Sequence, residues 1–212
     1  MLLLALAALA HSPHDVCPAV ARGADGTLLA GETDDLARFA PDGTIAAHLP
    51  SPGDTPVCLA SIGPGAWALV TAEGAAWRSD DDGARWTALA PEGAVACAEA
   101  DGGALLGGED GVWWLPATTG AAAEHLAEGA VTGVAEGPDG VYVLDGDGAL
   151  RVVGEDAPMV VHPGPWNVTA GGEVLLLADG PGVAVWEDGA AKAVAGPPDV
   201  VALAVGPYAW LA

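Results

Sequence analysis

Basic residues are scarce in this sequence. Its 212 residues include six Lys and Arg against 29 Asp and Glu, which gives a formal net charge of -23 at pH 7. There is one lysine, Lys192, and there is no glutamine. A surface of this charge repels the phosphates of nucleic acids and of anionic membranes. We therefore exclude nucleic acid as a partner.

Long hydrophobic runs are also missing. The apolar run Leu2–Ala10 falls far short of the ~20 residues that span a bilayer, so we expect no membrane span. It ends in Ala8-Leu9-Ala10, the small-x-small pattern that precedes a signal-peptidase cut. We predict a signal peptide over residues 1–10, a leader over 11–16 and a periplasmic or secreted protein. The alternative is an ordinary hydrophobic start or an edge strand.

Aromatic residues make up only 5% of the chain, whereas hydrophobic residues reach 51%. This composition predicts a globular protein with a core of small and β-branched side chains. Glycine (31) and proline (17) interrupt every segment before a helical period can develop, which favours strands and turns. One domain is expected at this length.

An acid-glycine pair recurs at a fixed spacing. Glu73-Gly74, Asp110-Gly111 and Asp147-Gly148 each follow the previous pair by 37 residues. β-rich runs flank each pair, for example Val141 to Leu144 before the last one and Ala149 to Val153 after it. Glycine tolerates a positive φ and aspartate bonds the local backbone, so each pair predicts a hairpin turn.

Each repeat contains two further strands, one before the hairpin and one after it. In the second repeat, for example, Val57 to Ser61 is the expected first strand and Arg85 to Leu89 the expected fourth. Four antiparallel strands in about 37 residues have the size of a propeller blade. We predict an all-β fold, a β-propeller of five to six four-stranded blades. The single domain covers 17–212, with blades over 17–50, 57–93, 94–129, 130–163, 166–199 and a partial blade over 200–212.

One segment carries a specific motif. The stretch Ser79 to Trp86 matches the pattern Ser-x-Asp-x-Gly-x-x-Trp through Ser79, Asp81, Gly83 and Trp86. Here the sequence resembles the Asp-box, or BNR, repeat family of β-propellers, which includes sialidases and sortilin-type receptors. The family places the box between the third and fourth strands of a blade and gives it a structural role.

The residues of the box agree with a structural role. Ser79 and Asp81 can bond the backbone of a tight turn in which Gly83 takes a positive φ, and Trp86 can pack the next strand onto the blade. The alternative is a cation held by Asp80, Asp81 and Asp82, but their spacing differs from that of a calcium loop. We expect no cofactor, with calcium as the alternative.

Resemblance to sialidases implies three arginines that hold a substrate carboxylate, a tyrosine nucleophile and an acidic aspartate. The chain has five arginines, and Arg38, Arg78 and Arg151 occupy nearly equivalent places on third strands. That equivalence indicates packing or surface roles. Neither tyrosine, Tyr142 or Tyr208, lies in a recognisable motif, so we identify no catalytic residue.

The three cysteines follow the repeat. Cys17, Cys58 and Cys97 lie 41 and 39 residues apart, each near the first strand of its blade. In an oxidising compartment Cys58 and Cys97 could form a disulfide between neighbouring blades and leave Cys17 unpaired. Three buried thiols are the alternative.

These observations favour an exported, noncatalytic β-propeller that acts as a monomeric scaffold for a protein or glycan partner. The acidic surface favours a basic or calcium-bridged partner. A sialidase-like glycosidase and a truncated, inactive propeller are the alternatives.

Overall fold

The computed structural model of this chain describes residues 19–137, 140–154, 159–162, 168–170, 175–178, 183–187, 190–194, 204–205 and 210–211. Within these ranges every regular element is a β-strand. The predicted signal peptide, the leader, Cys17 and Tyr208 lie outside the described residues.

The strands form five four-stranded antiparallel sheets and one two-stranded sheet. Blades 1 to 3 comprise β1 (Ala19–Arg22), β2 (Leu28–Gly31), β3 (Asp35–Phe39), β4 (Ile45–Pro50), β5 (Pro56–Gly63), β6 (Ala66–Thr71), β7 (Ala75–Ser79), β8 (Thr87–Glu92), β9 (Ala94–Ala100), β10 (Gly103–Gly108), β11 (Gly111–Pro116) and β12 (Glu124–Ala127). Blades 4 and 5 and the short sheet comprise β13 (Val131–Gly137), β14 (Gly140–Asp145), β15 (Leu150–Val152), β16 (Met159–His162), β17 (Val168–Ala170), β18 (Leu175–Ala178), β19 (Val183–Glu187), β20 (Ala190–Val194), β21 (Ala204–Val205) and β22 (Trp210–Leu211).

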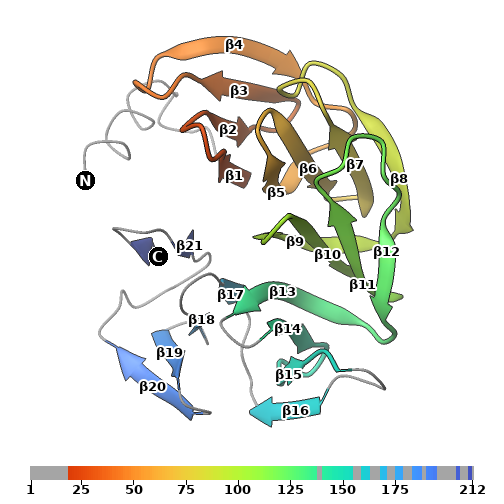
Figure 1. Ribbon diagram of the computed structural model, residues 1–212, viewed down its shortest axis with the longest axis vertical. Coiled ribbons are helices and arrows are strands. Elements are labelled where there is room, and N and C mark those ends of the chain that lie inside the picture. The colour runs from red at the N-terminus through yellow and green to blue at the C-terminus, as the bar shows by residue number, and fades with distance from the viewer. Residues whose placement is uncertain are drawn as a thin grey trace.

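The sheets are arranged around a common axis (Figure 1). The first strand of each four-stranded sheet lies nearest the axis and the fourth lies at the rim. Innermost strands of consecutive blades contact each other, as β5 contacts β9 and β9 contacts β13. The predicted all-β propeller with four-stranded blades is confirmed.

Burial follows this radial order. All residues of β6 and β10 are buried, whereas most residues of the outer strands β4 and β12 are exposed. A second strand has a neighbouring blade on each of its two faces, so it needs apolar side chains on both. This explains why Trp67 to Val70 forms a continuous hydrophobic run instead of alternating with polar residues.

Small residues allow the blades to approach each other. A Cβ on Gly107 of blade 3 would lie only 2.5 Å from Cγ1 of Val134 and 2.7 Å from Cγ2 of Val131, both in blade 4. The side chains of Leu105, Val134 and Val143 belong to the buried cluster between these two blades. The alanine-rich and glycine-rich composition therefore serves close packing of sheet on sheet.

The chain order gives the ring two distinct faces. The turns between first and second strands and between third and fourth strands lie at one end of each blade, which we call the box face. The turns between second and third strands and the links between blades lie at the other end, which we call the hairpin face. Hydrogen bonds agree: Asp82 N donates to Gly65 O on the box face, and Ala94 N donates to Gly74 O on the hairpin face.

One predicted strand boundary is wrong. We expected the fourth strand of blade 2 over Arg85 to Leu89, but β8 begins at Thr87. The backbone N–H of Arg85 donates to the Asp81 carboxylate, 2.8 Å away. Arg85 therefore belongs to the turn, because its N–H is taken by a side chain instead of a neighbouring strand.

Candidate functional site: the box turn and the ring around it

The hydroxyl group of Ser79 organises the box turn. Ser79 is buried at the end of β7, and its Oγ accepts hydrogen bonds from Gly83 N at 2.9 Å and Asp81 N at 3.3 Å. The same hydroxyl donates to Asp81 Oδ1 at 3.1 Å. Gly83 has a φ of 79° and Asp82 a φ of 60°. A left-handed conformation at two successive residues is what reverses the chain within so few positions.

Asp81 closes the turn on its other side. Its Oδ1 accepts the Arg85 N–H, and its Oδ2 lies 2.7 Å from Arg85 Nε. The hydrogen bonds from the Arg85 side chain and backbone, followed by that from Ser79, hold the pKa of the Asp81 carboxyl below its ordinary value. Asp81 thus remains charged over the neutral range and acts as a fixed acceptor.

The three consecutive aspartates of the box take three different arginines. Asp80 pairs with Arg78 at 2.8 Å, Asp81 pairs with Arg85 at 2.7 Å, and Asp82 pairs with Arg38 at 3.4 Å. Across the described ranges, no three His, Cys, Asp or Glu side chains are grouped so that they could hold a metal ion. In this arrangement each carboxylate of the box has a structural partner.

Arg78 is the most buried of these arginines, with 3% of its side chain exposed. Its Nη1 donates to Pro116 O at 2.8 Å, and its Nη2 donates to Ala117 O at 3.3 Å. Pro116 is the last residue of β11, and Ala117 directly follows it. Its Nε donates to Asp80 at 2.8 Å. The guanidinium therefore joins the box of blade 2 to the backbone of blade 3.

Arg38 makes the corresponding link from blade 1 to blade 2. Its Nη1 lies 3.4 Å from both the Asp82 backbone oxygen and the Asp82 carboxylate. Arg151 differs, because it pairs with Asp145 of its own blade at 2.6 Å. The sequence indicates nearly equivalent places for these three arginines. Arg38 and Arg78 also make equivalent contacts, since each reaches the next blade, whereas Arg151 bonds within its own blade.

Trp86 lies in the interface between blades 1 and 2. It packs against a buried cluster that includes Leu29 and Leu36 of blade 1 and Trp67 of blade 2. A Cβ on Gly83 would lie 3.2 Å from Leu49 Cδ1 and 3.6 Å from the Trp86 ring. We expected Trp86 to pack a strand onto its own blade, and it packs against the preceding blade as well.

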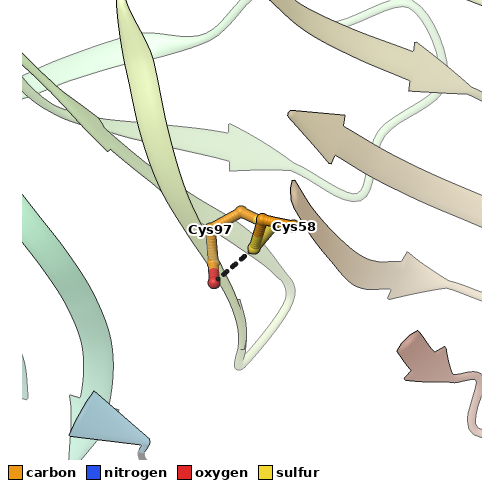
Figure 2. The surroundings of a disulfide bond; sticks show 2 residues. All are labelled: Cys58 and Cys97. Carbon is orange, nitrogen blue, oxygen red and sulfur yellow. Dashed lines mark hydrogen bonds between the residues drawn. A yellow bond between two sulfur atoms is a disulfide. The ribbon is translucent and has the colours of Figure 1, made fainter. Parts of the chain in front are cut away.

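A disulfide joins Cys58 of β5 to Cys97 of β9, with a Cα to Cα distance of 5.8 Å (Figure 2). Cys58 pairs with Val70 and Cys97 with Leu106, and both partners belong to the buried cluster between blades 2 and 3. The two side chains therefore face each other across that interface. Cys58 Sγ also lies 3.0 Å from the Cys97 carbonyl oxygen, where a reduced thiol would donate a hydrogen bond.

Two glutamates stand at equivalent places on innermost strands at the box face. Glu99 precedes the last residue of β9, and Glu136 precedes the last residue of β13. Partial desolvation raises the pKa of the Glu99 carboxyl, although its side chain remains open to water. Glu136 accepts a hydrogen bond from the Asp101 N–H of the preceding blade. This carboxylate therefore links blades 3 and 4 at the box face.

The residues considered for a sialidase-type reaction are dispersed. Tyr142 is 4% exposed and belongs to the buried cluster between blades 4 and 5. Arg38, Arg78, Arg85 and Arg151 are each in an ion pair with an aspartate. Arg22, at the box-face end of β1, is exposed.

Comparisons with known proteins agree on the fold. No protein-family model and no curated protein matches the chain. Among solved structures, the β-propeller domain of Cps50 (Swd1) from Myceliophteria thermophila has a TM-score of 0.66 at 16% identity, covering 93% of this chain and 78% of that one. The computationally designed Ika8 protein has a TM-score of 0.62 at 14% identity, covering 92% and 67%. The chain is a β-propeller.

Sequence reasoning missed the residues that connect one blade to the next. The equivalent third-strand places of Arg38 and Arg78 indicate packing or surface roles, but they do not show which group each arginine contacts. The carbonyl groups of Pro116 and Ala117 carry no sequence signal at all. Arginine recurs one residue before the end of the third strand in blades 1, 2 and 4, and this recurrence was the available clue.

The described ranges contain no helix that is long and apolar enough to cross a membrane.

Proposed function

We propose that this protein is an exported, noncatalytic β-propeller scaffold that binds a protein or glycan partner through the loops on one face of the ring. The observation that carries the proposal is the engagement of the arginines. Four of the five are tied to aspartates, and three of these pairs hold the box turn and the blades beside it. A sialidase would need three arginines free to bind a substrate carboxylate.

The burial of Tyr142 supports the same proposal, because a nucleophile must be reached by its substrate. The first test is hydrolysis of a fluorogenic sialoside by the purified chain. We expect no turnover above background. Turnover that disappears on replacing Tyr142 or Tyr208 with Phe would overturn the proposal of a noncatalytic protein and favour the alternative, a sialidase-like glycosidase.

Export and partner binding need their own tests. We expect cell fractionation to place the protein outside the cytoplasm, and we expect the mature chain to start at His11. Chemical crosslinking in intact producing cells should then link the protein to a defined partner. A protein that stays in the cytoplasm, or one that crosslinks to nothing and binds no glycan of an array, would contradict the proposal.

The protein is further proposed to act as a monomer without a resident cofactor. Size-exclusion chromatography with light scattering tests the first statement. Thermal unfolding in the presence of calcium or of a chelator tests the second, because a cation that binds only the folded state raises the melting temperature. A rise with calcium would favour the calcium alternative.

A further inference from the structure

The hairpin face carries a high density of unpaired negative charge. Eight exposed acidic residues lie at its turns, at its links or at the strand ends beside them: Asp34, Asp35, Glu73, Glu92, Glu109, Asp110, Glu128 and Asp147. Among the described residues, none of these eight carboxylates has an ion pair or a hydrogen-bond partner. This contrasts with the aspartates of the box, each of which is paired.

The arginines do not offset this charge, because most of them lie at the opposite face. Arg38, Arg78 and Arg85 are bound at the box turn, and Arg22 ends β1 at the box face. Arg151 alone turns towards the hairpin face, where it is bound to Asp145 at the end of β14. Among the described residues acidic side chains occur on both faces, but four of the five arginines lie on the box face, and only Arg151 lies beside the carboxylates of the hairpin face.

Exposed valines lie close to the axis on the same face. Val57 is 37% exposed and Val95 is 48% exposed, each at the start of an innermost strand. Both are β-bulge residues: the β5–β6 register skips Val57, between Pro56 and Cys58, and the β9–β10 register skips Val95. Bulges re-aim a side chain away from the sheet, and here they expose an apolar side chain at the same place in two consecutive blades.

Blade 4 repeats the bulge with a different residue. The β13–β14 register skips Thr132, which is exposed. Its hydroxyl donates to the carbonyl oxygens of Leu144 at 3.4 Å and Asp145 at 3.2 Å. The backbone of the bulge thus accepts either valine or threonine, and packing of the bulge does not require valine.

An apolar centre inside a charged rim is the general anatomy of a protein interface. We propose that the hairpin face is the docking surface for a basic segment of a partner protein that presents an apolar side chain between lysines or arginines. The apolar side chain would contact Val57 and Val95, and the cations would meet the carboxylates around them. A neutral glycan has no charge to meet this rim. The inference rests on the proposed function and narrows it to a protein partner.

The test uses two fluorescent synthetic peptides, one of alternating lysine and leucine and one of lysine alone at the same length. Binding to the full chain is followed by fluorescence anisotropy at several salt concentrations. Glu73→Lys with Glu109→Lys reverses two charges on the hairpin face. We expect this pair to raise the Kd of the lysine-leucine peptide about tenfold at low salt, with a smaller effect at high salt.

The matched control is Asp101→Lys with Glu124→Lys, which changes the net charge equally at the box-face side of blade 3. We expect the Kd of this control variant to stay within about twofold of wild type. A peptide bound at the hairpin face is affected mainly by charges near that face, whereas attraction by the net charge would respond to a reversal at either position. Val57→Thr with Val95→Thr keeps the shape found at Thr132. The double valine substitution should raise the Kd of the lysine-leucine peptide and leave the Kd of the lysine peptide unchanged.

Equal weakening by the two charge-reversal pairs would show attraction to the whole molecule and would overturn the docking surface. The docking surface would also be overturned if the lysine-leucine peptide did not bind. It would be overturned as well if the valine substitutions left the Kd of this peptide unchanged in variants that melt like wild type. These outcomes are separate from the crosslinking result. A crosslinked partner that survives the hairpin-face reversals and is lost with the box-face control would retain the scaffold function and place its site elsewhere.

Discussion

Arg78 donates a 2.8 Å hydrogen bond to the backbone oxygen of Pro116, and this bond crosses the boundary between blades 2 and 3. The guanidinium is almost entirely buried, and its other donors reach Ala117 O and Asp80. A buried guanidinium is stable only as long as these acceptors for its N–H groups are present.

Replacing Arg78 with Met should therefore destabilise the protein markedly. The substitution retains the apolar stem and leaves two carbonyl groups and the Asp80 carboxylate without their donor. We expect the free energy of unfolding to fall by about 3 kcal/mol, measured by urea denaturation. Arg85→Met is the control, because that arginine is 89% exposed and exposed pairs contribute little. Equal losses in the two variants would contradict the role assigned to Arg78.

The disulfide should make a large contribution to stability. It closes a loop between residues 39 apart in the sequence, for which the chain-entropy model gives about 4 kcal/mol. We expect Cys58→Ala with Cys97→Ala to lower the free energy of unfolding by an amount of this order. Reductant should destabilise wild type and leave the double variant unchanged. Alkylation under nonreducing conditions that labels all three cysteines would disprove the bond in solution.

A side chain at Gly107 should destabilise the protein. A Cβ at this position would meet Val131 and Val134 of blade 4 well inside van der Waals contact, so Gly107→Ala should force blades 3 and 4 apart. We expect a loss of about 1–3 kcal/mol, as for overpacked cores, seen as a lower melting temperature. At Gly146 an added Cβ meets nothing within 4 Å, and Gly146→Ala should melt like wild type. A stable Gly107→Ala protein would mean that these blades are further apart.

Asp145 should make stability depend on acid pH. Burial raises the pKa of its carboxyl, but hydrogen bonds from Ala149 N, Arg151 and Asp147 N outweigh burial and bring the pKa below its ordinary value. A folded-state pKa that is lowered gives stability that is present above about pH 4 and is lost as the pH falls further. Asp145→Asn should narrow the difference between the free energies of unfolding at pH 7 and pH 3.

The matched control for Asp145 is Asp147→Asn, which removes an exposed carboxylate two residues away in the same turn. It should leave the difference between pH 7 and pH 3 as in wild type. If both substitutions narrow it equally, the effect comes from the net charge of the turn and the Asp145 to Arg151 pair is not its source.

The blade repeat could be predicted from the sequence because its signal is local. Gly74 and Gly148 have φ values of 83° and 74° in the turns between second and third strands, where glycine follows an acid at the 37-residue spacing. A tight turn restricts the residues that can occupy it. Strand content then follows from the apolar runs between the turns.

The contacts between blades were less accessible to sequence reasoning. The residue directly after the bulge is Cys58 in β5 but Ala96 in β9, so Cys97 is offset by one position. A shift of one residue turns a side chain to the other face of its sheet, which is why Cys97 faces back towards Cys58. A period known only as about 37 residues does not resolve such a shift.

The hairpin-face valines were missed for a similar reason. In the sequence Val57 and Val95 look like core residues at the start of buried strands, and only the extra residue of the bulge exposes them. Bulges depend on pairing between two strands. Neither strand alone shows them.

Arg78 reaches across to the next blade by binding main-chain oxygens at positions 116 and 117, which any amino acid there would supply. The bond therefore specifies the path of the neighbouring backbone and leaves its side chains unspecified. Blades joined in this way can differ in sequence at the acceptor end while the ring keeps its geometry. A complete Ser-x-Asp-x-Gly-x-x-Trp box in blade 2 can thus stand beside a blade 3 whose corresponding turn, Pro116 to Ala123, contains no acidic residue.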